Sequence, residues 1–233
     1  MSLNVRVELE PAFILHVRPY RETSMLVYAL TQQHGIVHMI SRGAKKKGNN
    51  ILQPFVKMCM SWSGRGELVT LTKAELEYSK YTRNFRAQVQ CFYLHELMLR
   101  LMPKMSPAPE LFQLYEYTLD AMIKYPLRED LLRAFELQFL NIIGHPLQLK
   151  FDHQDDQEII REFYYQYEPD VGPSKCRSSR KQWNVISGEL ICALDEHKFS
   201  EEVLPQAKTF LRGLLQHYLR GKPLMTRQLL RVG

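Results

Sequence analysis

Polar and apolar positions alternate along the first eighty residues, which is the pattern of strands with one face buried. The segments with strand character are 13–18, 25–30, 36–40, 56–62 and 68–72. Ser63-Gly64-Arg65-Gly66 marks a turn, because its two glycines can adopt positive φ. About five short strands, with turns and no helix between them, predict a small closed β-barrel.

The apolar period changes to that of a helix after residue 90. Apolar residues recur at three- and four-residue spacing in three segments, which stop at Pro103, at Pro126 and at Gly144-His145-Pro146. The predicted helices cover 94–102, 111–123 and 129–143. A further helix is predicted to run from Ser200 as N-cap to Tyr218, followed by Gly221 and Pro223. Adjoining amphipathic helices can bury their apolar stripes together, so we expect a mainly α-helical C-terminal domain.

The region 150–198 has neither period. It is acidic between Asp152 and Asp170, polar and turn-rich up to Gln182, and compatible with a short hairpin around Ser187-Gly188. We expect a small irregular or β subregion here. The sequence therefore predicts an α+β protein with a barrel domain at 1–80 and a helical domain at 81–233.

Charge is segregated along this chain of net charge +6. Residues 1–80 hold eleven basic side chains against six acidic ones, whereas residues 146–170 hold two against seven. A basic excess on the barrel segment favours an anionic partner.

Catalytic signatures are not found in the sequence. Gly221-Lys222-Pro223 lacks the hydroxyl residue of a P-loop, and no nucleophile elbow is present. A metal-dependent nuclease using Asp152, Asp155 and Asp156 is an alternative, but no partner carboxylate on a second element is evident, which favours a solvated acidic face. We expect no enzyme activity and no small-molecule substrate.

Zinc is a second alternative. Cys176, Cys192, His153 and His197 flank the region without a clear period, but structural zinc usually takes closely spaced ligand pairs. We expect no metal and no cofactor. Free thiols, the lack of a signal peptide and the lack of a membrane-spanning apolar run lead us to expect a cytoplasmic, nucleoid-associated protein without a membrane partner.

The segment Ser41–Asn50, S-R-G-A-K-K-K-G-N-N, is the most informative one about function, because cationic side chains between two strands can follow a phosphate backbone. A solvated hairpin tip is the alternative interpretation. The predicted DNA contacts are Arg18, Arg21, Arg42, Lys45, Lys46, Lys47 and Arg65. The aromatic residues interleaved with them are Phe13, Tyr20, Tyr28, Phe55 and Trp62. Of these we expect Tyr20 to be exposed for base stacking and most others to be core.

Several motifs together resemble the bacterial RecO family of recombination mediators. The motifs are Arg18-Pro19-Tyr20-Arg21-Glu22-Thr23-Ser24, Ser41-Arg42-Gly43-Ala44-Lys45, Leu52-Gln53-Pro54-Phe55, Gly64-Arg65-Gly66-Glu67-Leu68 and Gly221-Lys222-Pro223-Leu224 with Thr226-Arg227. The resemblance implies an N-terminal OB-fold, binding of single- and double-stranded DNA, and annealing of complementary strands. It also implies cooperation with RecR in loading recombinase on DNA coated by single-strand-binding protein. Many relatives carry a four-cysteine zinc module, so this chain resembles the zinc-free branch.

The resemblance further implies a docking site for the acidic, Phe-ended tail of single-strand-binding protein. Its counterpart here is predicted at Arg128, Leu132, Arg133 and Phe139, where the arginines can pair with tail carboxylates and Leu132 or Phe139 can border a pocket for the terminal aromatic side chain. We therefore predict a non-catalytic protein that binds and anneals DNA in gap repair without sequence preference. A protein–protein adaptor that recognises acidic peptides is the alternative, and binding of a bare oligonucleotide distinguishes the two.

Overall fold

The computed structural model describes residues 5–44, 51–79, 84–126, 128–177 and 182–226. The chain forms two compact units, one of residues 1–127 with 224–233 and one of residues 128–223. The domain boundary that the sequence predicts after residue 80 stays a prediction.

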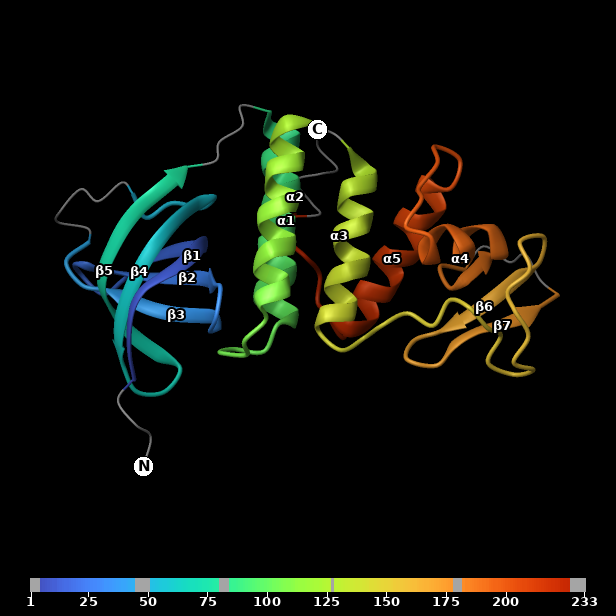
Figure 1. Cartoon of the computed structure of the whole chain (residues 1–233), viewed down its shortest axis with the longest axis horizontal. Helices are drawn as coiled ribbons and strands as arrows, with labels where there is room; N and C mark the ends of the chain where they lie inside the picture. The colour runs from blue at the N-terminus through green and yellow to red at the C-terminus, as the bar shows by residue number, and fades with distance from the viewer. Residues whose placement is uncertain (1–4, 45–50, 80–83, 127, 178–181, 227–233) are drawn as a thin grey trace. The chain divides into compact units, whose positions relative to one another are not determined.

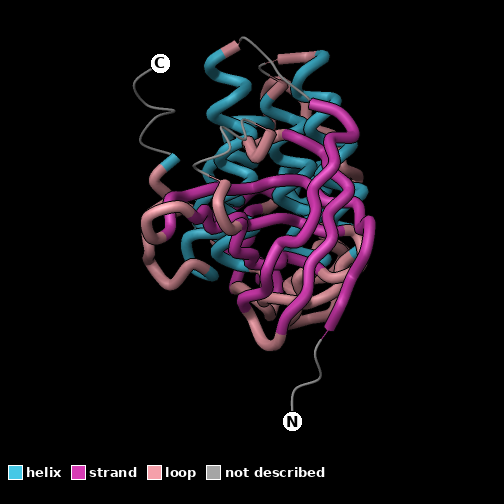
Figure 2. The backbone as a smooth tube through the Cα atoms, turned by 90° about the vertical axis from the view of Figure 1, so that its left-hand side faces the viewer, coloured by secondary structure: helices cyan, strands magenta, loops and turns pink. Residues whose placement is uncertain are grey.

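Five strands of the first unit close into a barrel in the order β1-β2-β3-β5-β4 (Figures 1 and 2). The strands are β1 (Val5–Tyr20), β2 (Ser24–Thr31), β3 (Gly35–Ser41), β4 (Val56–Gly64) and β5 (Leu68–Ser79). All neighbours are antiparallel except β3 and β5, which pair in parallel between His38–Ile40 and Leu68–Thr70. The predicted small barrel is confirmed, and five strands closed in this way make it OB-like.

Alternate residues of the strands fill the barrel. On β2 and β3 the inward residues are Val27, Ala29, Val37 and Met39, which lie in one cluster with Met58, Met60 and Trp62 of β4. The intervening residues of β2 and β3 therefore point outward. On β1 the pairing register shifts between Ile14 and His16, so that His16 lies opposite Tyr28 on the outer face.

Two helices of the first unit pack on the outside of the barrel next to β1 (Figure 1). α1 (Phe85–Leu101) begins where the Asn84 side chain accepts a 3.0 Å hydrogen bond from the Ala87 N–H, and Pro109 occupies the first turn of α2 (Pro109–Lys124). Phe13 of β1 packs against Phe112 and Tyr115 of α2 at centroid distances of 5.2 and 5.1 Å.

The second unit combines helices with a small sheet. α3 (Glu129–Ile142) packs against α5 (Leu204–Tyr218), and α4 (Gly188–Asp195) precedes α5 in the chain. The sheet has the order β7-β6-β8, from β6 (Tyr164–Glu168), β7 (Gly172–Cys176) and β8 (Val185–Ser187). A three-stranded sheet thus lies within 150–198, together with α4, a helix that the sequence pattern did not indicate.

The hairpin predicted around Ser187-Gly188 is wrong. Ser187 is instead the N-cap of α4, where its hydroxyl accepts a 3.2 Å hydrogen bond from the Leu190 N–H. Gly188 is required for packing rather than for a turn, because a Cβ there would lie 2.0 Å from the Ile160 carbonyl oxygen. The Ser-Gly pair has the composition of both a turn and a helix start, and tertiary packing selects the helix.

The start of the last helix also differs from the prediction. Ser200 holds a turn, with its hydroxyl 3.4 Å from the Val203 N–H, and α5 begins at Leu204. Glu201 and Glu202 belong to that turn, and Pro205 occupies the first turn of the helix.

Asp152 is not part of a solvated acidic face. Its side chain is buried, and its two carboxylate oxygens accept hydrogen bonds from the Gln154 and Lys175 N–H groups at 2.8 and 2.7 Å. Asp155 accepts a 3.1 Å hydrogen bond from the Gln157 N–H. The first of these carboxylates thus joins β7 to the preceding loop, and the second stabilises the loop itself.

Within the described ranges, no group of three or more His, Cys, Asp or Glu side chains is arranged to hold a metal ion. None of the described helices is long and apolar enough to cross a membrane.

Candidate nucleic-acid interface

A hollow on the barrel surface collects residues from the β1–β2 turn and from the end of β3. It has a volume of about 810 Å³ and is lined by Tyr20, Arg21, Glu22, Thr23, Ser24, Ile40 and Arg42. The strand register explains this grouping. Tyr20 pairs with Ser24 and Met25 pairs with Ser41, so the ladder brings the turn alongside Arg42. Two predicted DNA contacts, Arg21 and Arg42, are therefore neighbours in space.

Arg21 has an unusual backbone conformation, with φ +53°. Left-handed conformations cost a non-glycine residue roughly 1 kcal/mol, and residues that keep them often serve a functional site. Its guanidinium carbon lies 5.2 Å from the centroid of the Tyr20 ring, and Tyr20 is partly exposed. This side chain thus combines a positive charge with an adjacent aromatic face, as single-strand binding requires.

Arg18 extends the basic face along β1. Its Nε donates a 2.9 Å hydrogen bond to the Tyr28 hydroxyl, and its guanidinium carbon lies 5.8 Å from the Tyr28 ring centroid. Arg18 points outward, because the neighbouring Val17 packs against the barrel core. Arg18 and the residues of the hollow thus belong to one end of the outer β1–β2–β3 face.

The remaining predicted contacts are placed differently. Arg65 is exposed on the β4–β5 turn and does not line the hollow. Lys45, Lys46 and Lys47 lie outside the described residues, after the exposed Arg42. Contact of Arg65 and of the three lysines with DNA stays a prediction.

The predicted aromatic set divides between core and surface. Phe13 and Trp62 are buried, whereas Tyr20, Tyr28 and Phe55 are partly exposed. Phe55 packs against Phe92 of α1 at a centroid distance of 4.8 Å. Sequence reasoning missed the outward His16 and His38, which flank Tyr28. The alternation of inward and outward residues on β1 and β3 was the signal that could have found them.

Both histidines of this face favour the neutral form. Partial burial of its ring, and secondarily the charge of Arg18, lowers the pKa of the otherwise exposed His16. Burial, followed by the charge of Lys104, lowers the pKa of His38. At neutral pH these side chains are therefore uncharged rings, and the positive charge of the face comes from its arginines.

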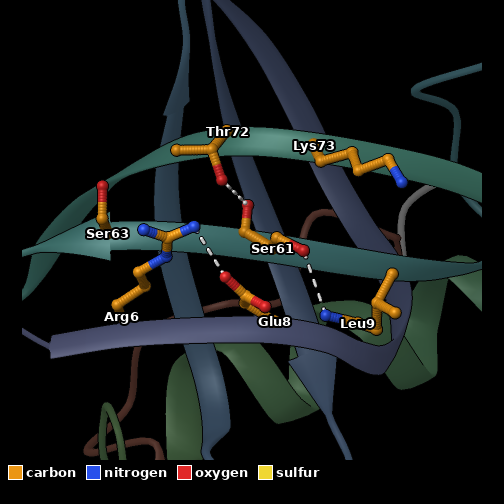
Figure 3. A pocket seen from close by; sticks show the side chains of 7 residues that line it. All are labelled: Arg6, Glu8, Leu9, Ser61, Ser63, Thr72 and Lys73. Carbon is orange, nitrogen blue, oxygen red and sulfur yellow. Dashed lines mark hydrogen bonds and ion pairs between the residues drawn. The ribbon is translucent and has the colours of Figure 1, made fainter.

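A second hollow on the barrel has a different character (Figure 3). It has a volume of about 550 Å³ and is lined by Arg6, Glu8, Leu9, Ser61, Ser63, Thr72 and Lys73. Arg6 pairs with Glu8 at 2.7 Å, and Lys73 pairs with Glu75 at 2.6 Å. Because the acidic neighbours compensate both cations, this hollow attracts a polyanion less strongly than the Arg21–Arg42 hollow does.

The residues of the predicted tail-docking site lie mainly in the interior. Leu132, Arg133 and Phe139 are buried, and Arg133 pairs with the buried Glu136 at 2.8 Å. Arg128 is exposed and binds Asp130 through Nε and Nη2 at 2.7 and 2.5 Å. Among the four predicted residues, Arg128 is the one with an exposed side chain.

An OB-like barrel with arginines and aromatic rings gathered on one outer face is typical of nucleic-acid-binding proteins. Comparison with known proteins gives the family. Residues 5–80 match the model of the recombination protein O N-terminal domain, and residues 83–228 match that of its C-terminal domain. The chain therefore belongs to the RecO family of DNA repair and recombination proteins, which are recombination mediators rather than enzymes.

Named relatives are similar over nearly the whole chain. The DNA repair protein RecO of Nitrosococcus oceani is 37% identical over 230 residues, which cover 97% of this chain and 94% of the relative. The RecO proteins of Methylococcus capsulatus and Coxiella burnetii are 36% and 39% identical, with 94% and 98% of their lengths covered.

Proposed function

We propose that this chain binds single- and double-stranded DNA through the outer β1–β2–β3 face and anneals complementary strands as a recombination mediator. The observation that carries this proposal is the hollow that brings Arg21 and Arg42 together beside Tyr20. Phosphate contacts come from Arg18, Arg21 and Arg42, with Lys45, Lys46, Lys47 and Arg65 in support.

Annealing in this proposal requires no covalent step. Two DNA strands repel one another through their phosphates, and a cationic face lowers this repulsion so that bases can pair. Contacts to phosphates carry no sequence information, so binding is expected to be independent of sequence.

A charge-removal experiment tests the DNA face. Arg21→Gly combined with Arg42→Ala removes two charges, and glycine suits the left-handed turn at position 21. The slope of log K against log salt for a single-stranded oligonucleotide is expected to fall by about 1.4, because each phosphate contact contributes about 0.7. Fluorescence anisotropy at several salt concentrations gives the slope, and annealing of labelled complementary strands is expected to slow in parallel.

The matched control removes two charges from the second hollow by Arg6→Ala combined with Lys73→Ala. This variant is expected to keep the wild-type slope and annealing rate, because Glu8 and Glu75 already compensate both cations. An equal loss in both double variants would show that only the net charge of the barrel matters and would remove the assignment to one face.

The proposal also covers the partners, the location and the subfamily of this chain. We infer that the chain acts with RecR, on DNA coated by single-strand-binding protein, in the cytoplasm at the nucleoid. The acidic tail of that protein would first meet the exposed Arg128. We place the chain in the zinc-free branch because its four cysteines do not form the closely spaced pairs of a structural zinc site.

A further inference from the structure

A row of three rings crosses the outer face of the barrel. The strand register places His16 opposite Tyr28 and Tyr28 opposite His38. The rings of His16 and Tyr28 have centroids 5.6 Å apart, and those of Tyr28 and His38 are 4.5 Å apart with planes at 69°. We define His16, Tyr28 and His38 as the ring row.

The ring row is open to solvent and does not belong to the hydrophobic core. The core contains Val27, Ala29, Val37 and Met39, which alternate with Tyr28 and His38 and point the opposite way. His16 is exposed, and the other two rings are partly exposed. Leu68, which pairs with His38 across the parallel β3–β5 contact, is also exposed and lengthens the apolar surface.

The charged groups nearest the ring row are Arg18, at its central ring, and the Lys104–Glu67 pair, at its His38 end. Arg18 lies beside Tyr28, and Lys104 near His38 is paired with Glu67 at 2.6 Å. Since burial and the nearby cations disfavour protonation of both histidines, the row presents π-faces rather than charges at neutral pH.

The ring row lies close to the proposed phosphate contacts. Arg42 follows His38 by four positions, just past the end of β3, which corresponds to roughly 13 Å in an extended chain. One OB-fold covers about 4–16 nucleotides, so a single chain of DNA can touch both places. In a duplex the base faces are stacked within the helix, and an outward protein ring row cannot reach them.

We propose that His16, Tyr28 and His38 form a stacking site for unpaired nucleobases, which distinguishes single strands from duplex on the same face that binds phosphates. The inference rests on the proposed DNA binding and adds to it the chemical class of the ligand group. Arginines hold the backbone, and the ring row holds the bases.

The test compares three ligands of equal length: a thymine oligonucleotide, the same backbone with abasic sugars, and a duplex. Tyr28→Leu keeps bulk but removes the π-face, and it is expected to weaken binding of the thymine oligonucleotide by about tenfold, as the loss of one base stack does. Binding of the abasic strand and of the duplex is expected to change less than about twofold. Tyr28→Phe keeps the ring and is expected to stay near wild type on all three ligands.

His38→Leu is the second variant and is expected to show the same selective loss, so the proposal stays testable if Tyr28→Leu does not fold. Tyr117→Leu, at an exposed tyrosine of α2 in the same unit, is the matched control and is expected to have no effect. A 2-aminopurine probe in the oligonucleotide adds a direct readout, because quenching by stacking should be lost in Tyr28→Leu.

Two results would overturn the inference. Equal losses on thymine and abasic strands would mean that Tyr28 only positions Arg18, and a loss of thermal stability without loss of affinity would mean that the row only stabilises the sheet. Failure of the wild-type chain to bind any of the three ligands would instead contradict the proposed function itself.

Discussion

Arg21 keeps a left-handed backbone conformation that a glycine would adopt at lower cost, while its side chain lies in the hollow beside Arg42. Sequence motifs predicted both arginines as contacts, because charge at a turn is visible in the sequence. The strained conformation is not visible, since it depends on how the β1–β2 turn closes between two paired strands. At this scale residue type is readable from the sequence, and conformation is not.

His95 is an interior residue whose type is likewise visible in the sequence and whose contacts are not. It is buried between β1 and α2, with Nδ1 2.8 Å from the Leu15 carbonyl oxygen and Nε2 2.5 Å from the Tyr115 hydroxyl. A carbonyl only accepts hydrogen bonds, so Nδ1 carries the proton and Nε2 accepts from the tyrosine. Burial lowers the pKa of this imidazole to about 3. The sequence placed His95 inside the helix predicted at 94–102, but it did not indicate the two hydrogen-bond partners.

This histidine predicts a loss of stability in acid. Below pH 6.5 the unfolded chain binds a proton on His95 that the folded chain refuses until about pH 3. The contribution of His95 to the free energy of unfolding is therefore fully present above pH 6.5. Below pH 6.5 it falls by about 1.4 kcal/mol per pH unit. Urea unfolding at pH 7.5, about 5.5 and about 4.5 measures the effect.

His95→Gln supplies the comparison, because an amide can donate to Leu15 and accept from Tyr115 without titrating. The variant is expected to be less stable at pH 7.5 by about 1–2 kcal/mol and to have a shallower pH profile. Parallel profiles for the two proteins would mean that other groups cause the acid sensitivity.

At the scale of elements, the start of β3 is fixed by a close backbone contact. Gly35 has φ +66°, and a Cβ there would lie 2.0 Å from the Ser106 carbonyl oxygen. The Met105 N–H donates a 3.1 Å hydrogen bond to the Ile36 carbonyl oxygen, which holds the segment after α1 against the barrel. The sequence predicted a strand at 36–40, directly after Gly35, whereas the contact with residues about seventy positions later became visible only in the fold.

Gly35→Ala is expected to lower the free energy of unfolding by about 3 kcal/mol or more, because a backbone clash adds to the conformational strain. Gly43→Ala is the matched control. Gly43 has φ +68° but nothing within 4 Å of the position of a Cβ, so a loss of only about 1 kcal/mol is expected. Chemical denaturation of both variants measures the difference. Similar losses would mean that the segment after α1 moves away from β3 without cost.

Helices and strands with a strong period could be predicted from the sequence. The helices predicted at 111–123 and 129–143 correspond closely to α2 and α3. α4 was missed because it has only eight residues, and its start resembles a turn. A short element is defined by its neighbours more than by its own periodicity, and for α4 the neighbour is the Ile160 backbone.

At the scale of the whole molecule, both domains of the family are present in one chain. A charge reversal can separate the two proposed activities, which are annealing of bare strands and annealing of strands coated by single-strand-binding protein. Arg128→Glu is expected to leave annealing of bare strands within about twofold of wild type. It is expected to slow annealing of strands coated by single-strand-binding protein several-fold, because a glutamate repels an acidic tail. Annealing of a fluorescent strand pair with and without the coating protein measures both.

Arg128 is the suitable position for this test. Its side chain is 56% exposed, and loss of its pair with Asp130 costs at most about 1 kcal/mol at the surface. Arg133→Glu would instead place a second carboxylate beside the buried Glu136 and is expected to unfold the protein. Lys198→Glu, an exposed charge reversal in the same unit, is the control. A loss with Lys198→Glu as large as with Arg128→Glu would argue against a specific docking site.

The strand and helix periods can be read from the sequence alone, as can the basic excess of the barrel segment and the motifs of the family, because each of these lies in residues near one another in the chain. Which residues share a surface depends on the tertiary structure. It joined Arg21 to Arg42 through the strand register, buried Arg133 and Phe139, and placed His16, Tyr28 and His38 in one row. Register and burial arise from pairings between distant segments, and no local pattern of residues specifies them.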